Sequence, residues 1–220
     1  LFQDVEVAVP SVVDGYRTVV SAQMPELHAA YMGMIAVVSF CGTAGYLIGS
    51  ELLIPDRRLA MSSRKPWRVI MLRLLSLLAV SPVATVGALL LVPLVRQPDD
   101  WLWFAGAHLG AGFAFTLFGF CLGLVLDRVA GILVMMFFPF IDVGIAQDYM
   151  LGPVLPGWSV YLPSHPFVQI CISAAFGGEV FDIGYAFWGA GIVLAAAVAA
   201  VGVMARGVRP AYVAAKGGAI

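Results

Sequence analysis

Long, mostly apolar runs recur along the chain, and short polar segments separate them. An α-helix rises 1.5 Å per residue, so about 20 apolar residues cross a hydrocarbon core of about 30 Å. The pattern predicts five transmembrane helices, at Ala29–Leu53, Trp67–Val95, Trp101–Leu126, Val129–Gln147 and Ile183–Ala205.

The composition agrees with this pattern. Of the 220 residues, 61% are hydrophobic and 11% are charged, and the mean hydropathy is +0.96. A soluble domain of this size needs a more strongly charged surface, so the sequence predicts an all-α, polytopic helical membrane protein made of one domain. Residues 1–28 carry acidic side chains and prolines. We expect them to form an outer, interfacial segment, with Pro25 at the start of the first span.

Basic residues give the expected orientation. The stretch Pro55–Arg73 lies between the first two spans and holds half of the twelve Lys and Arg residues, namely Arg57, Arg58, Arg64, Lys65, Arg68 and Arg73. Loops this basic stay in the cytoplasm by the positive-inside rule. We therefore expect the N-terminus outside the cell, the tail 206–220 in the cytoplasm, and the protein in the plasma membrane.

The basic stretch has two compatible interpretations. As a topogenic signal it would face anionic lipid head groups, which contributes about 1 kcal/mol per basic side chain. As a docking element it would bind a soluble partner, and its length, greater than a bare turn needs, favours this second role.

The segment Asp148–Asp182 predicts a re-entrant structure. It contains Pro153, Pro156, Pro163 and Pro166, and its apolar pieces are too short to span a bilayer. Irregular backbone at membrane depth is tolerated only where protein or a water-filled cavity covers it. We expect a pair of short helices that dips in from the outer face; an ordinary outer loop with an interfacial helix is the alternative.

Small residues and prolines predict how the spans pack and bend. Glycines four residues apart let two helices approach closely, and such pairs occur at Gly45/Gly49, Gly106/Gly110 and Gly119/Gly123. Pro82 lies inside the second span and is expected to kink it.

Three residues within the spans are candidates for a substrate pathway. Asp142 is the most informative, because a carboxylate inside a bilayer costs about 2.5–3.5 kcal/mol and usually faces a bundle interior or water. It would instead be interfacial if its span ended near Pro139. His108 and Phe138 are weaker candidates, since a lone His often makes a helix–helix hydrogen bond and an aromatic residue often only packs.

Catalytic and metal-binding patterns are absent from the sequence. There is no GxxxxGK[ST] run, no GxSxG and no HExxH, so we expect no ATP hydrolysis by this chain. The three cysteines, Cys41, Cys121 and Cys171, show no CxxC or Cys/His spacing and are expected to pack as small apolar residues, with no metal or cofactor in the chain.

Two segments resemble the permease subunits of ABC exporters of the second type, which export drugs, polysaccharides and glycolipids. In the first, Glu51 and Arg57–Arg58 precede LAMSSRKPWRVIMLRLL; in the second, LPGWSVYLPSHPFVQICISAAFGG precedes the last span. At the loop, IPDRRLA stands where the family has a Glu-rich run with Gly-Thr. Members have six spans, so the resemblance implies that the first span is missing here.

The resemblance also implies a mechanism and partners. The chain would be one permease half that moves a lipophilic or amphiphilic substrate out of the cell. It would pair with a second half, identical or different, and with nucleotide-binding subunits that hold ATP and Mg, and it would contact membrane lipid but no nucleic acid. The coupling residues would be Glu51, Arg57, Arg58, Arg64, Lys65 and Arg68.

Two other functions stay open. An ion-coupled secondary transporter should show inverted repeats and several charges within the membrane, whereas we find no repeat and only Asp142 and His108. A membrane scaffold subunit that transports nothing is the other alternative.

Overall fold

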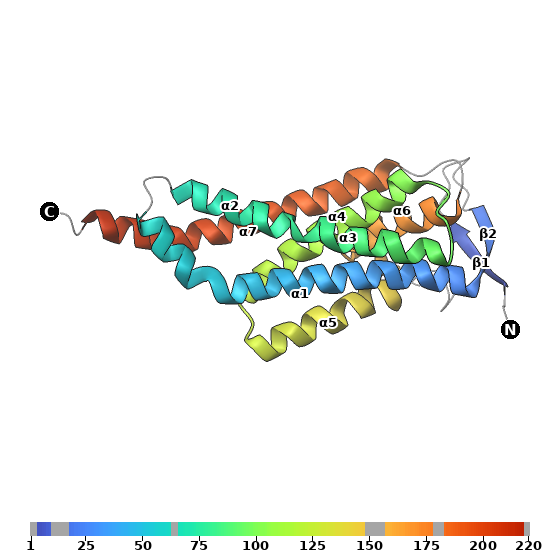
Figure 1. Ribbon diagram of the computed structural model, residues 1–220, viewed down its shortest axis with the longest axis horizontal. Helices are drawn as coiled ribbons and strands as arrows, with labels where there is room; N and C mark the ends of the chain where they lie inside the picture. Colours follow the sequence, from blue (N-terminus) through green and yellow to red (C-terminus); the bar gives the residue numbers. More distant parts are fainter. Residues whose placement is uncertain (1–3, 10–17, 63–65, 148–156, 178–182, 218–220) are drawn as a thin grey trace.

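The computed structural model of the protein describes residues 4–9, 18–62, 66–147, 157–177 and 183–217. These residues form an elongated helical bundle with one small β-hairpin (Figure 1). The α-helices are α1 (Met24–Ser62), α2 (Pro66–Leu78), α3 (Val80–Leu91), α4 (Trp101–Gly123), α5 (Arg128–Gly144), α6 (His165–Phe176) and α7 (Ile183–Gly217). Two 3-10 turns, η2 (Val92–Leu94) and η3 (Ser159–Tyr161), follow α3 and precede α6.

Four helical segments among the described residues are long and apolar enough to cross a membrane: Met24–Ser50, Met71–Leu94, Trp101–Gly123 and Ile183–Arg206. The fifth expected span, Val129–Gln147, corresponds to α5, which has only 17 residues. At 1.5 Å per residue α5 is about 25 Å long, shorter than a hydrocarbon core of about 30 Å. The prediction of helical spans is therefore confirmed for four segments, and the prediction of about five is not.

Helix α4 lies at the centre of the bundle and packs most closely on α1. A Cβ atom added at Gly45 would lie 2.0 Å from the Thr116 carbonyl oxygen, and one at Gly49 would lie 2.4 Å from that of Phe120. The fit is reciprocal, because a Cβ at Gly119 would lie 2.0 Å from the Gly42 carbonyl oxygen. The backbones of the two helices are thus in direct contact, as the spacing of these glycines predicts.

The second span is broken in the middle, as Pro82 predicts. Helix α2 ends at Leu78 and α3 begins at Val80, with Ala79 between them. Proline has no N–H to donate, and its ring clashes with the carbonyl four residues earlier, which here belongs to Leu78.

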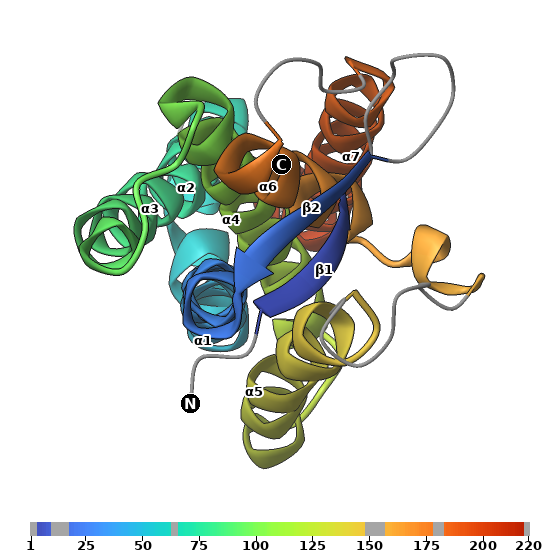
Figure 2. The same cartoon turned by 90° about the vertical axis from the view of Figure 1, so that its right-hand side faces the viewer.

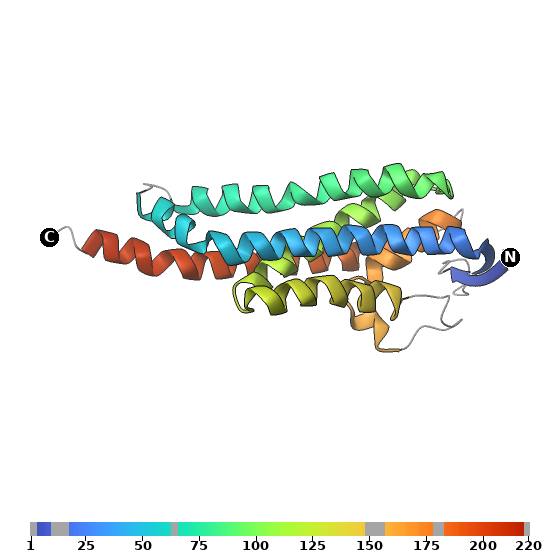
Figure 3. The same cartoon turned by 60° about the horizontal axis from the view of Figure 1, so that its bottom comes forward.

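The basic stretch is more helical than a loop. Helix α1 continues to Ser62, and Pro66 is the first residue of α2, so only residues 63–65, which lie outside the described part, connect the two helices. Helix α1 has 39 residues and α7 has 35, or about 58 Å and 52 Å. Both exceed the thickness of a hydrocarbon core, and they extend together with α2 at one end of the bundle (Figures 1 and 3). We name this end the basic end.

The opposite end carries the β-hairpin, and we name it the hairpin end. Strands β1 (Asp4–Val9) and β2 (Thr18–Gln23) pair antiparallel, with Asp4 opposite Gln23. They lie across the end of the helices, and β2 leads directly into α1 (Figure 2). Pro25 is the second residue of α1, as expected, but the strands were not predicted.

We predict that Gly45→Ala loosens the whole bundle, because its methyl group would meet the backbone of α4. Overpacking of this kind costs about 1–3 kcal/mol. The midpoint of thermal unfolding, measured in detergent, should fall clearly. Gly106→Ala is the matched control, because an added Cβ there meets nothing within 4 Å and its unfolding midpoint should stay the same or rise. Equal midpoints for the two variants would contradict the direct contact of α1 with α4.

Candidate functional site: a buried polar cluster at the short helix

Helix α6 is a short helix inside the bundle near the hairpin end. Every residue from His165 to Phe176 is buried, and the helix packs on α4 and α7. The sequence predicts a pair of short re-entrant helices in the segment Asp148–Asp182. Its described residues contain one α-helix, α6, and the turn η3. Residues 148–156 and 178–182 of the expected segment lie outside the described part, so the second helix of the pair stays a prediction.

Asp142 of α5 binds the N-terminal end of α6. Its carboxylate accepts a hydrogen bond from the backbone N–H of Ser164 at 3.3 Å and another from the Ser164 hydroxyl group. Ser164 directly precedes α6, and both residues are fully buried. A negative charge at a helix N-terminus is favourable, because the helix dipole places partial positive charge there.

Gln147 extends the cluster to two further elements, η3 and α1, and adds a second contact to α6. Its side-chain amide donates to the Ser159 carbonyl at 2.9 Å, and its side-chain oxygen lies 2.8 Å from Nδ1 of His165. Because the amide nitrogen is used as a donor, the oxygen must accept, which places a proton on Nδ1 of His165. The hydroxyl group of Tyr31, on α1, donates to the Gln147 backbone carbonyl at 2.8 Å.

Aromatic residues of α7 close the cluster on another side. The His165 ring lies with its centroid 5.8 Å from that of Tyr185 and 5.7 Å from that of Trp188. Contacts of His165 therefore join α6 and α7 to Gln147, three residues beyond the end of α5. His165 is only 4% exposed, although it lies in the segment Asp148–Asp182, for which an ordinary outer loop is the alternative expectation.

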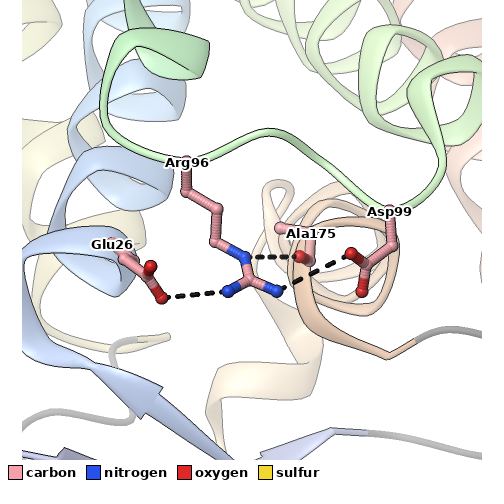
Figure 4. Close-up of polar contacts among 4 residues, drawn as sticks. All are labelled: Glu26, Arg96, Asp99 and Ala175. Carbon is pink, nitrogen blue, oxygen red and sulfur yellow. Dashed lines mark hydrogen bonds and ion pairs between the residues drawn. The ribbon is translucent and has the colours of Figure 1, made fainter.

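Arg96 binds the other end of α6 (Figure 4). Its Nε donates to the Ala175 carbonyl at 3.1 Å, and its guanidinium group lies 4.8 Å from the centre of the Phe176 ring. The same guanidinium pairs with Glu26 of α1 at 3.0 Å and with Asp99 at 3.6 Å. These contacts satisfy carbonyl groups that a helix leaves unpaired at its C-terminal end.

The loop that carries Arg96 also starts the central helix. The backbone N–H of Asp100 donates to the Ala174 carbonyl at 2.9 Å. Its carboxylate accepts from the N–H groups of Leu102 and Trp103, which caps the N-terminus of α4. The loop therefore fixes α6 relative to α4.

The arrangement is suited to holding a short helix in place. Among the described residues no group of three or more His, Cys, Asp or Glu side chains could hold a metal ion. The cluster unites α1, α5, α6 and α7 through groups that would be costly to bury alone. Movement of α1, α5 or α6 within the cluster would have to break buried hydrogen bonds.

The three pathway candidates from the sequence contact different sets of residues. His108 is fully buried on α4, where its Nδ1 lies 2.9 Å from the Phe104 carbonyl, and its Nε2 has no hydrogen-bond partner in the described part of the chain. Phe138 packs against Phe115 and Phe118 at centroid distances of 6.2 and 5.6 Å. Only Asp142 belongs to the polar cluster, where its side chain is fully buried in protein.

Most residues of the cluster were not singled out in the sequence. Tyr31 and Gln147 stand in expected spans, and Ser164 follows a proline, so nothing marks them as partners of Asp142. The expected coupling residues remain untested: the side chains of Glu51, Arg57 and Arg58 and all of residues 64–65 lie outside the described part. Arg68 is exposed on α2.

No protein-family model, no curated protein and no solved structure matches the chain.

We predict that Asp142→Ala frees α6, because the Ser164 N–H and hydroxyl groups would lose a buried acceptor. Each unsatisfied group costs about 1–3 kcal/mol. Cys171 of α6 is 2% exposed and therefore reports on opening of the helix. In a Cys121→Ala background, the rate at which a maleimide labels Cys171 should rise at least tenfold.

Asp127→Ala is the control for this experiment. Asp127 caps the N-terminus of α5 by accepting from the N–H groups of Val129 and Ala130, at the end of this helix opposite Asp142. Its loss should cost about 1 kcal/mol without a change in Cys171 labelling. Equal labelling rates in the two variants would refute a specific role for Asp142 at α6.

Proposed function

We propose that the chain is the permease half of an ATP-driven ABC exporter that moves a lipophilic or amphiphilic substrate out of the cell. The observation that supports this most is the joint extension of α1, α2 and α7 at the basic end (Figure 1). Helices that continue past the thickness of a bilayer present a surface to soluble partners. The short α1–α2 connection lies at this surface, within the segment that resembles the coupling region of this family.

The orientation follows from the charges. In this proposal the basic end is cytoplasmic, because six of the twelve Lys and Arg residues belong to the segment Pro55–Arg73. Arg206, Arg209 and Lys216 near the C-terminus belong to the same end. The hairpin end would face the outside of a plasma membrane, and ATP and Mg would be bound by nucleotide-binding subunits at the basic end.

Helix α1 would transmit a movement from the basic end to the groups that hold α6. It runs without interruption from the α1–α2 connection, through the glycine contact with α4, to Tyr31 of the polar cluster. A tilt imposed at the basic end would therefore act on the groups that hold α6. A second permease half would complete the pathway on the apolar side faces, which leave many large hydrophobic side chains exposed.

A second candidate is an ion-coupled transporter, and the buried carboxylate of Asp142 favours it. Such residues often carry protons or bind ions in transporters. The two functions differ in energy source: transport by reconstituted protein would follow a pH gradient in the second case and added ATP with a partner ATPase in the first. A scaffold subunit would transport nothing under either condition.

We predict that the double variant Arg57→Glu with Arg58→Glu loses coupling to the partner ATPase. The two reversals change the local charge by four units, which would place like charges against an acidic docking groove at a cost of several kcal/mol. Substrate-stimulated ATPase activity of the reconstituted complex should fall at least tenfold. Arg206→Glu with Arg209→Glu changes the charge equally on α7 of the same end, so comparing the two variants shows whether the docking contact lies on the α1–α2 side or on α7. Unchanged assembly and export in the Arg57/Arg58 variant would reduce these residues to topogenic charges.

Orientation can be tested separately. Cysteines introduced at Gln97 and Tyr161, both exposed and near the hairpin end, should react with a membrane-impermeant maleimide in intact cells. Cysteines at Ser62 and Lys216 should react only after the membrane is opened. Labelling of Ser62→Cys in sealed cells would reverse the proposed orientation and remove the docking surface from the cytoplasm.

A further inference from the structure

An apolar groove of about 530 Å³ lies between α1 and α3. Ala29, Gly33 and Phe40 line it on α1, and Val83, Gly87 and Leu91 line it on α3. The groove falls within two segments that are long and apolar enough to cross a membrane, so in a bilayer it would lie at the depth of the lipid chains. Its volume is in the range of small-molecule sites, about 300–1,000 Å³.

The groove is long and narrow. Its lining on α1 runs from Ala29 to Phe40, which corresponds to about 17 Å at 1.5 Å per residue. This is close to one leaflet, half of a hydrocarbon core of about 30 Å. Gly87 leaves open space, because an added Cβ there would meet nothing within 4 Å. These dimensions suit a single extended alkyl chain.

Charged residues stand at the mouth of the groove at the hairpin end. Glu26 lies three residues before Ala29, and Arg96 lies four residues after Val92, so their ion pair (Figure 4) links α1 to the loop that follows α3, beside this end of the groove. Asp99 pairs with the same guanidinium and is 41% exposed, and Asp100 follows it. Three carboxylates against one guanidinium give a net charge of −2 among these side chains.

The charge at the mouth selects among amphiphiles. A phosphate or carboxylate head group would meet net repulsion there, whereas an ammonium group would be attracted to Asp99 and Glu26. Arg96 already uses its Nε for the Ala175 carbonyl and both terminal nitrogens for Glu26 and Asp99, so it is engaged with the protein.

We infer that the groove between α1 and α3 binds an amphiphile with one long alkyl chain and a cationic head group, the chain lying in the groove and the head group at Glu26 and Asp99. This inference rests on the proposed export function for its meaning: the groove lies toward the hairpin end, the outer side in that proposal, so it names the class of substrate that the permease would pass to the outer leaflet.

The test measures binding to the purified chain in phosphatidylcholine nanodiscs. The probe is an undecylammonium ion with a dansyl group at the far end of its chain, and energy transfer from tryptophan reports its binding. The same chain ending in a carboxylate is the anionic counterpart. We expect the ammonium probe to bind at least fivefold more tightly than the carboxylate probe.

Gly87→Leu tests the contribution of the groove to binding, Asp99→Asn tests the contribution of its mouth, and Gly106→Leu is the control. Gly87→Leu should fill the groove and weaken binding of the ammonium probe at least tenfold. Gly106→Leu, placed in equally open space in another groove between α4, α6 and α7, should leave binding unchanged. Asp99→Asn keeps the Arg96–Glu26 pair and should weaken only the ammonium probe, about threefold to fivefold. Circular dichroism and size-exclusion profiles that match the unsubstituted protein establish that each variant is folded.

Equal affinities for the two probes, or unchanged binding in Gly87→Leu, would overturn the inference. If Gly87→Leu disrupted self-association of the chain but not probe binding, the groove would be an interface between two copies and the inference would again be wrong. The assay contains no ATPase, so a failure of the proposed export function would leave the binding result intact. If the unsubstituted chain supported ATP-driven export but did not bind the ammonium probe, only this site would be refuted.

Discussion

The contact between α1 and α4 is the constraint on which the rest of the structure depends. Where two backbones touch, each helix fixes the rotation and height of the other, because no side chain is available to adjust the spacing. Gly45 and Gly49 fit against α4 while Gly119 and Gly123 fit against α1, so the contact is interlocked from both sides. The turn that follows α4 is tied to the same helix, since the Tyr46 hydroxyl donates to the Asp127 carbonyl at 2.6 Å. The starting point of α5, and with it the position of Asp142, therefore follows from the glycine contact.

A twelve-residue helix buried in an apolar bundle needs polar partners at both ends. Its first N–H groups and last carbonyl groups have no partner within the helix, and lipid offers none. Here Asp142 accepts from the N-terminal end, while Arg96 and the Asp100 N–H donate to the C-terminal end. The signs of these charges match the helix dipole at each end. This explains why charged residues that would be costly elsewhere in the bundle are found beside α6.

The sequence predicted features that depend on residues close together in the chain and missed those that depend on distant contacts. Glycine spacing predicted close helix approach at Gly45/Gly49 and at Gly119/Gly123, and Pro82 predicted the break between α2 and α3, because both signals are local; that the two glycine pairs meet each other was not predicted. The same spacing at Gly106 and Gly110 was less informative: Gly110 faces Phe167 of α6, and Gly106 faces open space. Asp142 was recognised as costly to bury, but its partners Ser164 and Gln147 could not be found, since no local pattern relates them. The β-hairpin was missed because its short strands lie within a segment that also suits an interfacial coil.

Helix α1 connects the features of this protein that bear on function. Along one continuous helix lie the basic end, the glycine contact, one wall of the apolar groove, Tyr31 of the polar cluster and Glu26 of the ion pair. A rigid rotation of α1 is opposed by backbone contact with α4, so movement of α1 relative to α4 has to be a tilt about that contact. Such a tilt changes the width of the groove between α1 and α3 and, at the same time, pulls on Glu26 and Tyr31 at the far end. Access to the groove and release of α6 would then be coupled by geometry alone, without a separate element to transmit the signal.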